Sequence, residues 1–150
     1  MSLTWMTDSV ARKPLLVGEM NPYSSDPRRA LYPLPRGATG DRLREILELS
    51  DAEYLRLFDR ADLFHKGERW KVADARARAA DLAAGRDDLV LLGTRVCHAF
   101  NVPFVPFTVH RLVRPMNTSD DLARVRILPH PSGRNRMWDD PTAAKRARAT

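Results

Sequence analysis

Two short apolar runs, each ending in glycine, limit most strongly what this chain can fold into. They are Pro-Leu-Leu-Val-Gly at 14–18 and Leu-Val-Leu-Leu-Gly at 89–93. A continuous apolar run of this length is typical of a strand that is buried on both faces, as strands are in a parallel sheet. We therefore expect a central sheet that helices cover on both sides.

The segments between and after these runs predict an alternating α/β order. Helical spacing is found at 41–49, and Ser50 with Glu53 forms a capping box for a second helix. Thr94 is expected to cap a short helix, and Pro141 to occupy the first position of the last one. The remaining predicted elements are strands at 61–64 and 125–128 and helices at 70–84, 94–100 and 142–149. Alternation of this kind indicates a mainly parallel sheet.

Two proline-containing segments are exceptions to this alternation. Residues 19–40 hold four prolines and two glycines, which exclude a helix or a central strand and predict a long loop. Long loops in compact domains usually have a function. Residues 104–109 have strand composition, but Pro103 and Pro106 favour an edge strand or a loop.

Length and cysteine content limit the class of protein. A chain of 150 residues predicts a single domain, in which residues 1–13 form a flexible tail. The single cysteine, Cys97, excludes an internal disulfide, a cysteine zinc site and an iron–sulfur cluster. We expect no metal and no cofactor. No apolar run is long enough to span a membrane, and residues 1–13 lack the core of a signal peptide. The expected protein is a cytoplasmic monomer without a membrane partner.

The net charge of +6 is concentrated near one end of the chain. Residues 111–150 hold nine basic and four acidic residues, whereas residues 1–110 hold 16 and 15. A localised basic region favours a polyanion partner such as nucleic acid. A basic surface that only aids solubility fits the same balance, so charge alone does not decide between the two.

Polar residues follow the first and the last predicted strands. Glu19-Met20-Asn21-Pro22-Tyr23 follows one, and His130-Pro131-Ser132 follows the other. The carboxyl ends of parallel strands form the ligand-binding edge of an open α/β sheet. There a carboxamide can hold a water molecule, and an imidazole can donate a hydrogen bond to developing negative charge. Alternatively, Asn21 and Ser132 satisfy turns and His130 caps a strand end.

These two segments resemble the signature motifs of the uracil-DNA glycosylase superfamily. Leu15–Pro22 is similar to the first motif, with the Met-Asn-Pro form of the single-strand-selective and mismatch-specific branches, and His130-Pro131-Ser132 matches the second. Gly40, Arg42 and Leu43, together with Leu91-Leu92-Gly93, resemble two further features, and all four follow in the family's order. The resemblance implies a three-layer α/β/α domain with a four-stranded, mainly parallel sheet. It also implies an enzyme that flips a base out of DNA and hydrolyses its glycosidic bond without a metal or cofactor.

The resemblance also implies roles for individual residues. Asn21 would position the attacking water, His130 would stabilise the departing base, and Glu19 would act as a base or cap the following turn. The residues expected to bind the base are Met20, Tyr23, Tyr32, Asp62 and Phe64. The residues expected to contact DNA, single-stranded or double-stranded, are Ser132, Gly133, Arg134, Asn135, Arg136, Arg124 and Arg126.

Two departures from the family pattern concern the base. Tyr23 stands where the Met-Asn-Pro branches usually have glycine, and its ring would exclude the 5-methyl group of thymine. Asp62 stands where the family usually has asparagine. Ionised aspartate only accepts hydrogen bonds, so it would favour an exocyclic amine such as that of cytosine, whereas protonated Asp62 could mimic asparagine. The expected substrate is thus uracil or another deaminated or modified base.

Two other functions fit the same sequence. One is a non-catalytic nucleic-acid-binding protein that retains the glycosylase fold, which Asp62 favours. The other is a hydrolase of free nucleosides or nucleotides, which would be favoured if the basic residues lay away from the cleft.

Overall fold

A five-stranded sheet forms the centre of the computed structural model, which describes residues 13–113, 122–132 and 135–150. The strands, in sheet order, are β2 (Asp59–Phe64), β1 (Leu15–Met20), β3 (Asp88–Leu92), β5 (Leu122–Leu128) and β4 (Thr108–Val113). The first four run parallel, and β4 pairs with β5 in the antiparallel sense. The α/β class and the parallel sheet are confirmed.

The expected number of four strands is wrong, because β4 adds a fifth strand at one edge. Its prolines explain the difference. Pro103 and Pro106 precede Thr108 and do not interrupt the strand, so every residue of β4 keeps its backbone N–H for the ladder. The sequence window at 104–109 covers only the first two residues of β4, and the strand continues to Val113.

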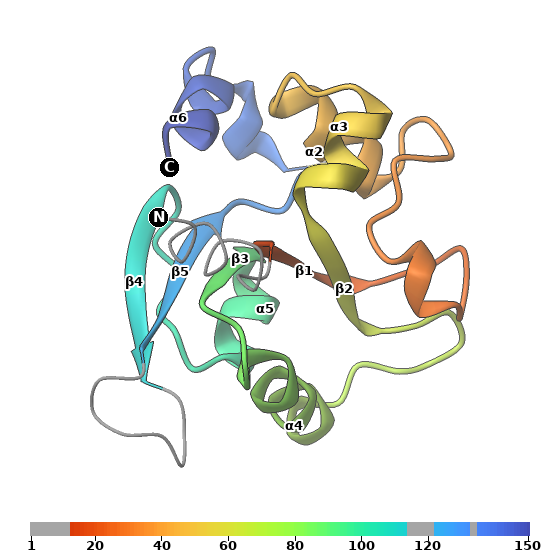
Figure 1. Ribbon diagram of the computed structural model, residues 1–150, viewed down its shortest axis with the longest axis vertical. Helices are drawn as coiled ribbons and strands as arrows, with labels where there is room; N and C mark the ends of the chain where they lie inside the picture. Colours follow the sequence, from red (N-terminus) through yellow and green to blue (C-terminus); the bar gives the residue numbers. More distant parts are fainter. Residues whose placement is uncertain (1–12, 114–121, 133–134) are drawn as a thin grey trace, which may run out of the picture.

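Helices cover both faces of the sheet (Figure 1). They are α2 (Thr39–Ile46), α3 (Asp51–Leu57) and α6 (Ala143–Ala149) on one face and α4 (Val72–Ala83) and α5 (Thr94–Ala99) on the other. Two short 3-10 helices, Pro27–Arg29 and Arg136–Asp139, lie in the connecting loops.

Strand alternation divides the core into two layers. Leu16, Val90 and Leu128 pack with Leu43 of α2 and fully buried Tyr54 of α3 on one face. The other face of the sheet packs against α4 and α5, and its strand residues include Leu15, Val17, Leu89, Leu91 and Ile127. Because both faces are buried, the strands read as continuous apolar runs.

Local signals at the helix ends are partly confirmed. Ser50 and Glu53 form both hydrogen bonds of the capping box of α3. Thr94 is the first residue of α5, and Gly93, at φ +93°, takes the N-cap position in its place. Pro141 lies two residues before α6, outside the helix. Within the described residues, no helix is both long and apolar enough to cross a membrane.

Candidate active site

Four parallel strands end at one edge of the sheet, and two backbone hydrogen bonds tie the residues beyond them together. The Asn21 N–H donates to the Phe64 carbonyl at 3.0 Å, which joins the ends of β1 and β2. The Gly93 N–H donates to the Leu128 carbonyl at 2.9 Å, which joins the ends of β3 and β5. The backbone is therefore tied in two pairs, β1 with β2 and β3 with β5, at the edge predicted to be functional.

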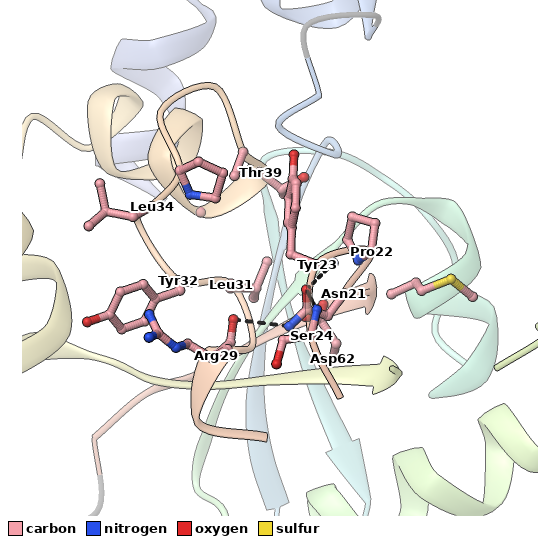
Figure 2. A pocket seen from close by; sticks show the side chains of 14 residues that line it. Asn21, Pro22, Tyr23, Ser24, Arg29, Leu31, Tyr32, Leu34, Thr39 and Asp62 are labelled. Atoms are coloured by element: carbon pink, nitrogen blue, oxygen red, sulfur yellow. Dashed lines mark hydrogen bonds between the residues drawn. The ribbon is translucent and has the colours of Figure 1, made fainter. Parts of the chain in front are cut away.

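A pocket of about 200 Å³ lies at the β1–β2 end of this edge (Figure 2). Its volume is below the range of about 300–1,000 Å³ for drug-sized ligands, which suits a single small ring. Five residues predicted from the sequence line it: Met20, Asn21, Tyr23, Tyr32 and Asp62. Residues not predicted also line it: Pro22, Ser24, Arg29, Leu31, Leu34, Pro35, Ala38, Thr39 and Gly40. The long loop at 19–40 thus supplies nearly the whole wall.

Gly40 allows this loop to lie against the first turn of α2. A Cβ atom at Gly40 would lie 2.2 Å from the Leu31 carbonyl oxygen and 2.4 Å from that of Tyr32. No side chain fits such a gap, so the close approach requires glycine. The buried Tyr54 hydroxyl donates to the same Leu31 oxygen at 2.8 Å. The pocket wall is therefore fixed from two sides.

The Asn21 amide shapes the turn after β1. It is 4% exposed, and its Oδ1 accepts from the backbone N–H groups of Tyr23 at 2.9 Å and Ser24 at 3.2 Å. Its Nδ2 donates to the Arg29 carbonyl at 3.2 Å (Figure 2). Both lone pairs of the amide oxygen are thus used within the chain. Asn21 thus satisfies a turn, which was one of the two alternatives that the sequence left open. Within the described part of the chain, the second Nδ2 hydrogen has no acceptor.

Asp62 lies in the wall of the pocket, opposite Gly18 of β1 in the strand register. The residue is 8% exposed, and its Oδ1 has no hydrogen-bond partner among the described residues. A Cβ at Gly18 would lie 2.4 Å from that oxygen, so the glycine makes room for the carboxyl group. Burial raises the pKa of Asp62 to about 7, and the charge of Glu19 adds to the rise. Near neutral pH this carboxyl group exists in both protonation states.

The His130 ring is oriented by its own loop. Its Nδ1 accepts from the Ser132 N–H at 3.1 Å, which in the neutral ring leaves the hydrogen on Nε2. Burial lowers the pKa of His130, against the opposing effect of the Glu19 charge, and favours this neutral form. The imidazole therefore offers one N–H donor.

Three hydrogen bonds hold the backbone on either side of this ring. The side chains of Asn135 and Trp138 donate to the His130 carbonyl at 3.0 and 2.9 Å. Arg42 of α2 donates through Nε to the Pro131 carbonyl at 2.8 Å. Since α2 also borders the pocket through Thr39 and Gly40, Arg42 connects the pocket wall to the histidine loop.

Glu19 and His130 both approach Gly93, the residue that follows β3. A Cβ at Gly93 would lie 3.2 Å from the His130 Cβ and 3.8 Å from Glu19 Oε1. Glu19 also lies 3.9 Å from the Arg95 guanidinium of α5, in a weak ion pair. Neither Glu19 nor His130 lines the pocket, and both stand beside it on the same edge.

The aromatic residues predicted to bind a base have three different environments. Tyr23 is 56% exposed at the pocket. The Tyr32 ring has the guanidinium groups of Arg29 and Arg60 over it, at 4.7 and 5.4 Å. The structure does not place Phe64 where a base-binding residue was expected, because its side chain is 1% exposed and lies in the core. Its ring packs against Trp70 with 4.9 Å between centroids, on the side of α4, and is absent from the pocket wall.

The predicted DNA contacts after β5 are partly structural. Asn135 anchors its loop and caps the following 3-10 helix, and the Ser132 carbonyl accepts from the Asn135 N–H at 3.0 Å. Arg136 is exposed and lies 3.5 Å from Asp139 in an ion pair. Gly133 and Arg134 lie outside the described residues.

Arg124 and Arg126 lie within β5, before its carboxyl end, and not in the loop that carries His130. Arg124 stands opposite Asp88, the first residue of β3, about 20 Å of extended chain before His130. Arg126 forms an ion pair with Asp88, and its Nε donates to the Thr150 carbonyl at 3.1 Å. Closeness in sequence was misleading because each residue of an extended strand advances the chain by about 3.3 Å along the strand.

Sequence reasoning missed several contributors to the pocket, of which Gly18 and Arg29 are two examples. Gly18 interrupts an apolar strand run, and an isolated strand glycine is a known signal of close approach. Arg29 gave no such signal, because its position depends on how the 19–40 loop folds back on α2.

The described residues hold no group of three or more histidine, cysteine or acidic side chains that could bind a metal ion. Comparisons with family models, with curated proteins and with solved structures found no match for this chain.

Proposed function

We propose that this chain is a DNA glycosylase, which hydrolyses the bond between a deaminated or modified base and its sugar. One observation supports this most directly. His130 Nδ1 accepts the Ser132 N–H, which leaves the hydrogen of the neutral ring on Nε2, and Glu19 approaches the same Gly93 on the edge that also holds the Asp62 pocket. A neutral donor next to an acceptor suits a reaction in which a base leaves as an anion while water attacks.

In the proposed reaction, the electron pair of the glycosidic bond leaves with the base. His130 donates its Nε2–H to the pyrimidine O2, where negative charge develops. Glu19 accepts a proton from the water that adds to C1′, and the departing base takes up a proton from solvent. Asn21 acts mainly through the turn that it forms, because its Oδ1 already accepts two backbone hydrogen bonds.

Asp62 would determine which base the pocket accepts. Its protonated form has one O–H donor and one carbonyl acceptor, which match O4 and N3–H of uracil. Its ionised form only accepts and would favour a base with an exocyclic amine. Because the pKa of Asp62 is raised to about 7, uracil excision should weaken as the pH rises through neutrality.

Base excision is tested with labelled oligonucleotides that contain one uracil, hypoxanthine, xanthine or cytosine. Both strand forms are incubated with the protein and then cleaved with alkali at abasic sites. Scission should be lost in His130→Ala and Glu19→Gln and retained in Arg56→Gln, which changes an exposed residue of α3. Asp62→Asn should increase uracil excision. Scission on no substrate would contradict the proposal, and binding without scission would favour a non-catalytic nucleic-acid-binding protein.

A hydrolase of free nucleosides or nucleotides is the second candidate, and the placement of two arginines favours it. Arg124 and Arg126 lie away from the pocket, so they provide no track for a DNA backbone beside it. Release of free base from deoxyuridine or its 5′-monophosphate, with no scission of any oligonucleotide, would support this candidate over the first.

A further inference from the structure

Arg29 is the one cationic side chain among the described residues that line the pocket. Arg29 is exposed, lines the pocket, and makes no hydrogen bond or ion pair through its side chain with any described residue. The nearby carboxylate of Asp26 is bound by the neighbouring Arg28, at 3.2 Å from Nε and 3.1 Å from Nη2. Arg29 therefore keeps its guanidinium donors available for a ligand.

The segment that carries Arg29 is held in place at four points. Asn21 donates to the Arg29 carbonyl, and Arg60 of β2 donates to the carbonyls of Arg28 at 3.3 Å and Ala30 at 2.9 Å. The Tyr54 hydroxyl donates to the Leu31 carbonyl at 2.8 Å. A loop fixed by this many cross-connections presents its side chains in a defined direction, which lowers the entropy lost on binding.

The Arg29 side chain is itself oriented by an aromatic ring. Its guanidinium carbon lies 4.7 Å from the centre of the Tyr32 ring. Figure 2 shows both side chains on the side of the pocket opposite Tyr23. Arginine stacked on an aromatic ring keeps its planar fork of N–H donors free at the edge, a geometry that suits two phosphate oxygens.

We propose that Arg29 forms a phosphate-binding site at the mouth of the pocket, so that the ligand is recognised as a nucleotide and not as a base or nucleoside. The nucleotide part of this inference rests on the proposed function, whereas the phosphate contact does not. The phosphate belongs either to a free monophosphate or to the backbone of a nucleic acid. In both cases the same guanidinium fork would bind its oxygens.

The test measures binding and does not require catalysis. Dissociation constants are determined for deoxyuridine, its 5′-monophosphate and a trinucleotide with a central uracil, with wild-type protein, Arg29→Gln and Arg56→Gln. The two variants remove the same charge from exposed positions, and Arg56 lies on α3, outside the pocket wall. The monophosphate should bind wild-type protein more tightly than deoxyuridine, and Arg29→Gln should weaken that binding about five- to tenfold, as expected for one bidentate pair.

The expected pattern is a weaker binding of the monophosphate in Arg29→Gln that neither Arg56→Gln nor the binding of deoxyuridine shares. Equal losses in both variants would show only a general effect of positive charge and would overturn the proposal. If Arg29→Gln weakens binding of the trinucleotide alone, the site is assigned to a nucleic-acid backbone. If it also weakens binding of the monophosphate, the site is assigned to free nucleotides as well.

A direct readout separates this site from the proposed function. The Arg29 Nε–H resonance, identified by its absence in Arg29→Gln, should shift when inorganic phosphate is added. This shift is expected even if no base is ever excised. Base excision without a shift of the Arg29 resonance, and without weaker binding in Arg29→Gln, would overturn the phosphate site but not the proposed glycosylase activity.

Discussion

The backbone N–H of Ser132 donates a 3.1 Å hydrogen bond to Nδ1 of His130. This bond exists only while Nδ1 carries no hydrogen, so it links the protonation state of the ring to the shape of the loop after β5. Protonation would place two N–H groups face to face.

The first prediction concerns this tautomer. At pH 7 the His130 ring should be neutral with its hydrogen on Nε2, and its pKa should lie below the ordinary value of about 6.5 because burial disfavours the charged form. Nitrogen-15 NMR of the imidazole, with His130→Asn for assignment, measures both properties. A hydrogen on Nδ1, or a pKa above the ordinary value, would contradict the assigned geometry.

The second prediction concerns the stability contributed at Asp62. Its pKa is raised to about 7 in the folded chain, so the folded state binds the proton more tightly than the unfolded state. Stability should therefore fall as the pH rises from about 4 to about 7, as the buried carboxyl becomes ionised. Asp62→Asn lacks this loss and should exceed wild type above pH 7, by roughly 2–4 kcal/mol.

Urea unfolding at a series of pH values measures this difference. Asp59→Asn, at the more exposed start of the same strand, serves as the control for a general effect of charge. Parallel pH dependence in wild type and Asp62→Asn would show that the carboxyl is ionised at little cost.

The third prediction concerns the close contact at Gly40. Gly40→Ala places a methyl group 2.2 Å from the Leu31 oxygen, so the loop and α2 must separate. We expect a loss of roughly 3 kcal/mol in the free energy of unfolding, at the upper end for overpacking. Gly37→Ala is the control: its Cβ meets nothing within 4 Å and only its φ of +90° is unfavourable, at about 1–2 kcal/mol. Equal losses would show that the loop and α2 separate at little cost, so that the contact does not require glycine at position 40.

The fourth prediction concerns Arg42, a positioning residue. Arg42→Leu removes the bond to the Pro131 carbonyl and frees the loop that orients His130. If the chain excises bases, kcat should fall about tenfold or more, because small misplacements of catalytic groups are costly. KM should stay nearly constant, since Arg42 does not line the pocket.

Arg56→Leu on α3 is the matched control for the loss of one arginine. A folded Arg42→Leu variant with unchanged kcat would show that Asn135 and Trp138 position the loop without help from α2.

The sheet was predictable from sequence mainly where strands are buried on both faces. The runs at 14–18 and 89–93 need no tertiary information, because continuous apolar residues have few other uses in a chain of this size. Only the first two residues of β4 fell within the segment predicted from the sequence. Its single packed face and flanking prolines give a weak pattern, and pairing with β5 supplies the rest.

The site was predictable where residues follow strand ends. Asn21 and Asp62 share one pocket because parallel strands bring their ends to one edge. Phe64 could not be placed in the same way. Its position at the strand end predicted proximity but not direction, and the ring packs into the core beside Trp70. The position of Arg29 depends on how the loop folds, which the Gly40 contact and the hydrogen bonds from Asn21, Arg60 and Tyr54 determine.

Gly93 lies between Glu19 and His130 and has no side chain. The site therefore depends on the space that the absent side chain leaves. Glu19 belongs to β1 and His130 follows β5, and both approach the end of the intervening strand β3 at Gly93, which has no Cβ. Transplanting the site to another sheet would therefore require removing a side chain as well as copying several. An inventory of reactive residues would overlook this position, although every substitution there alters the distance between the two groups that it separates.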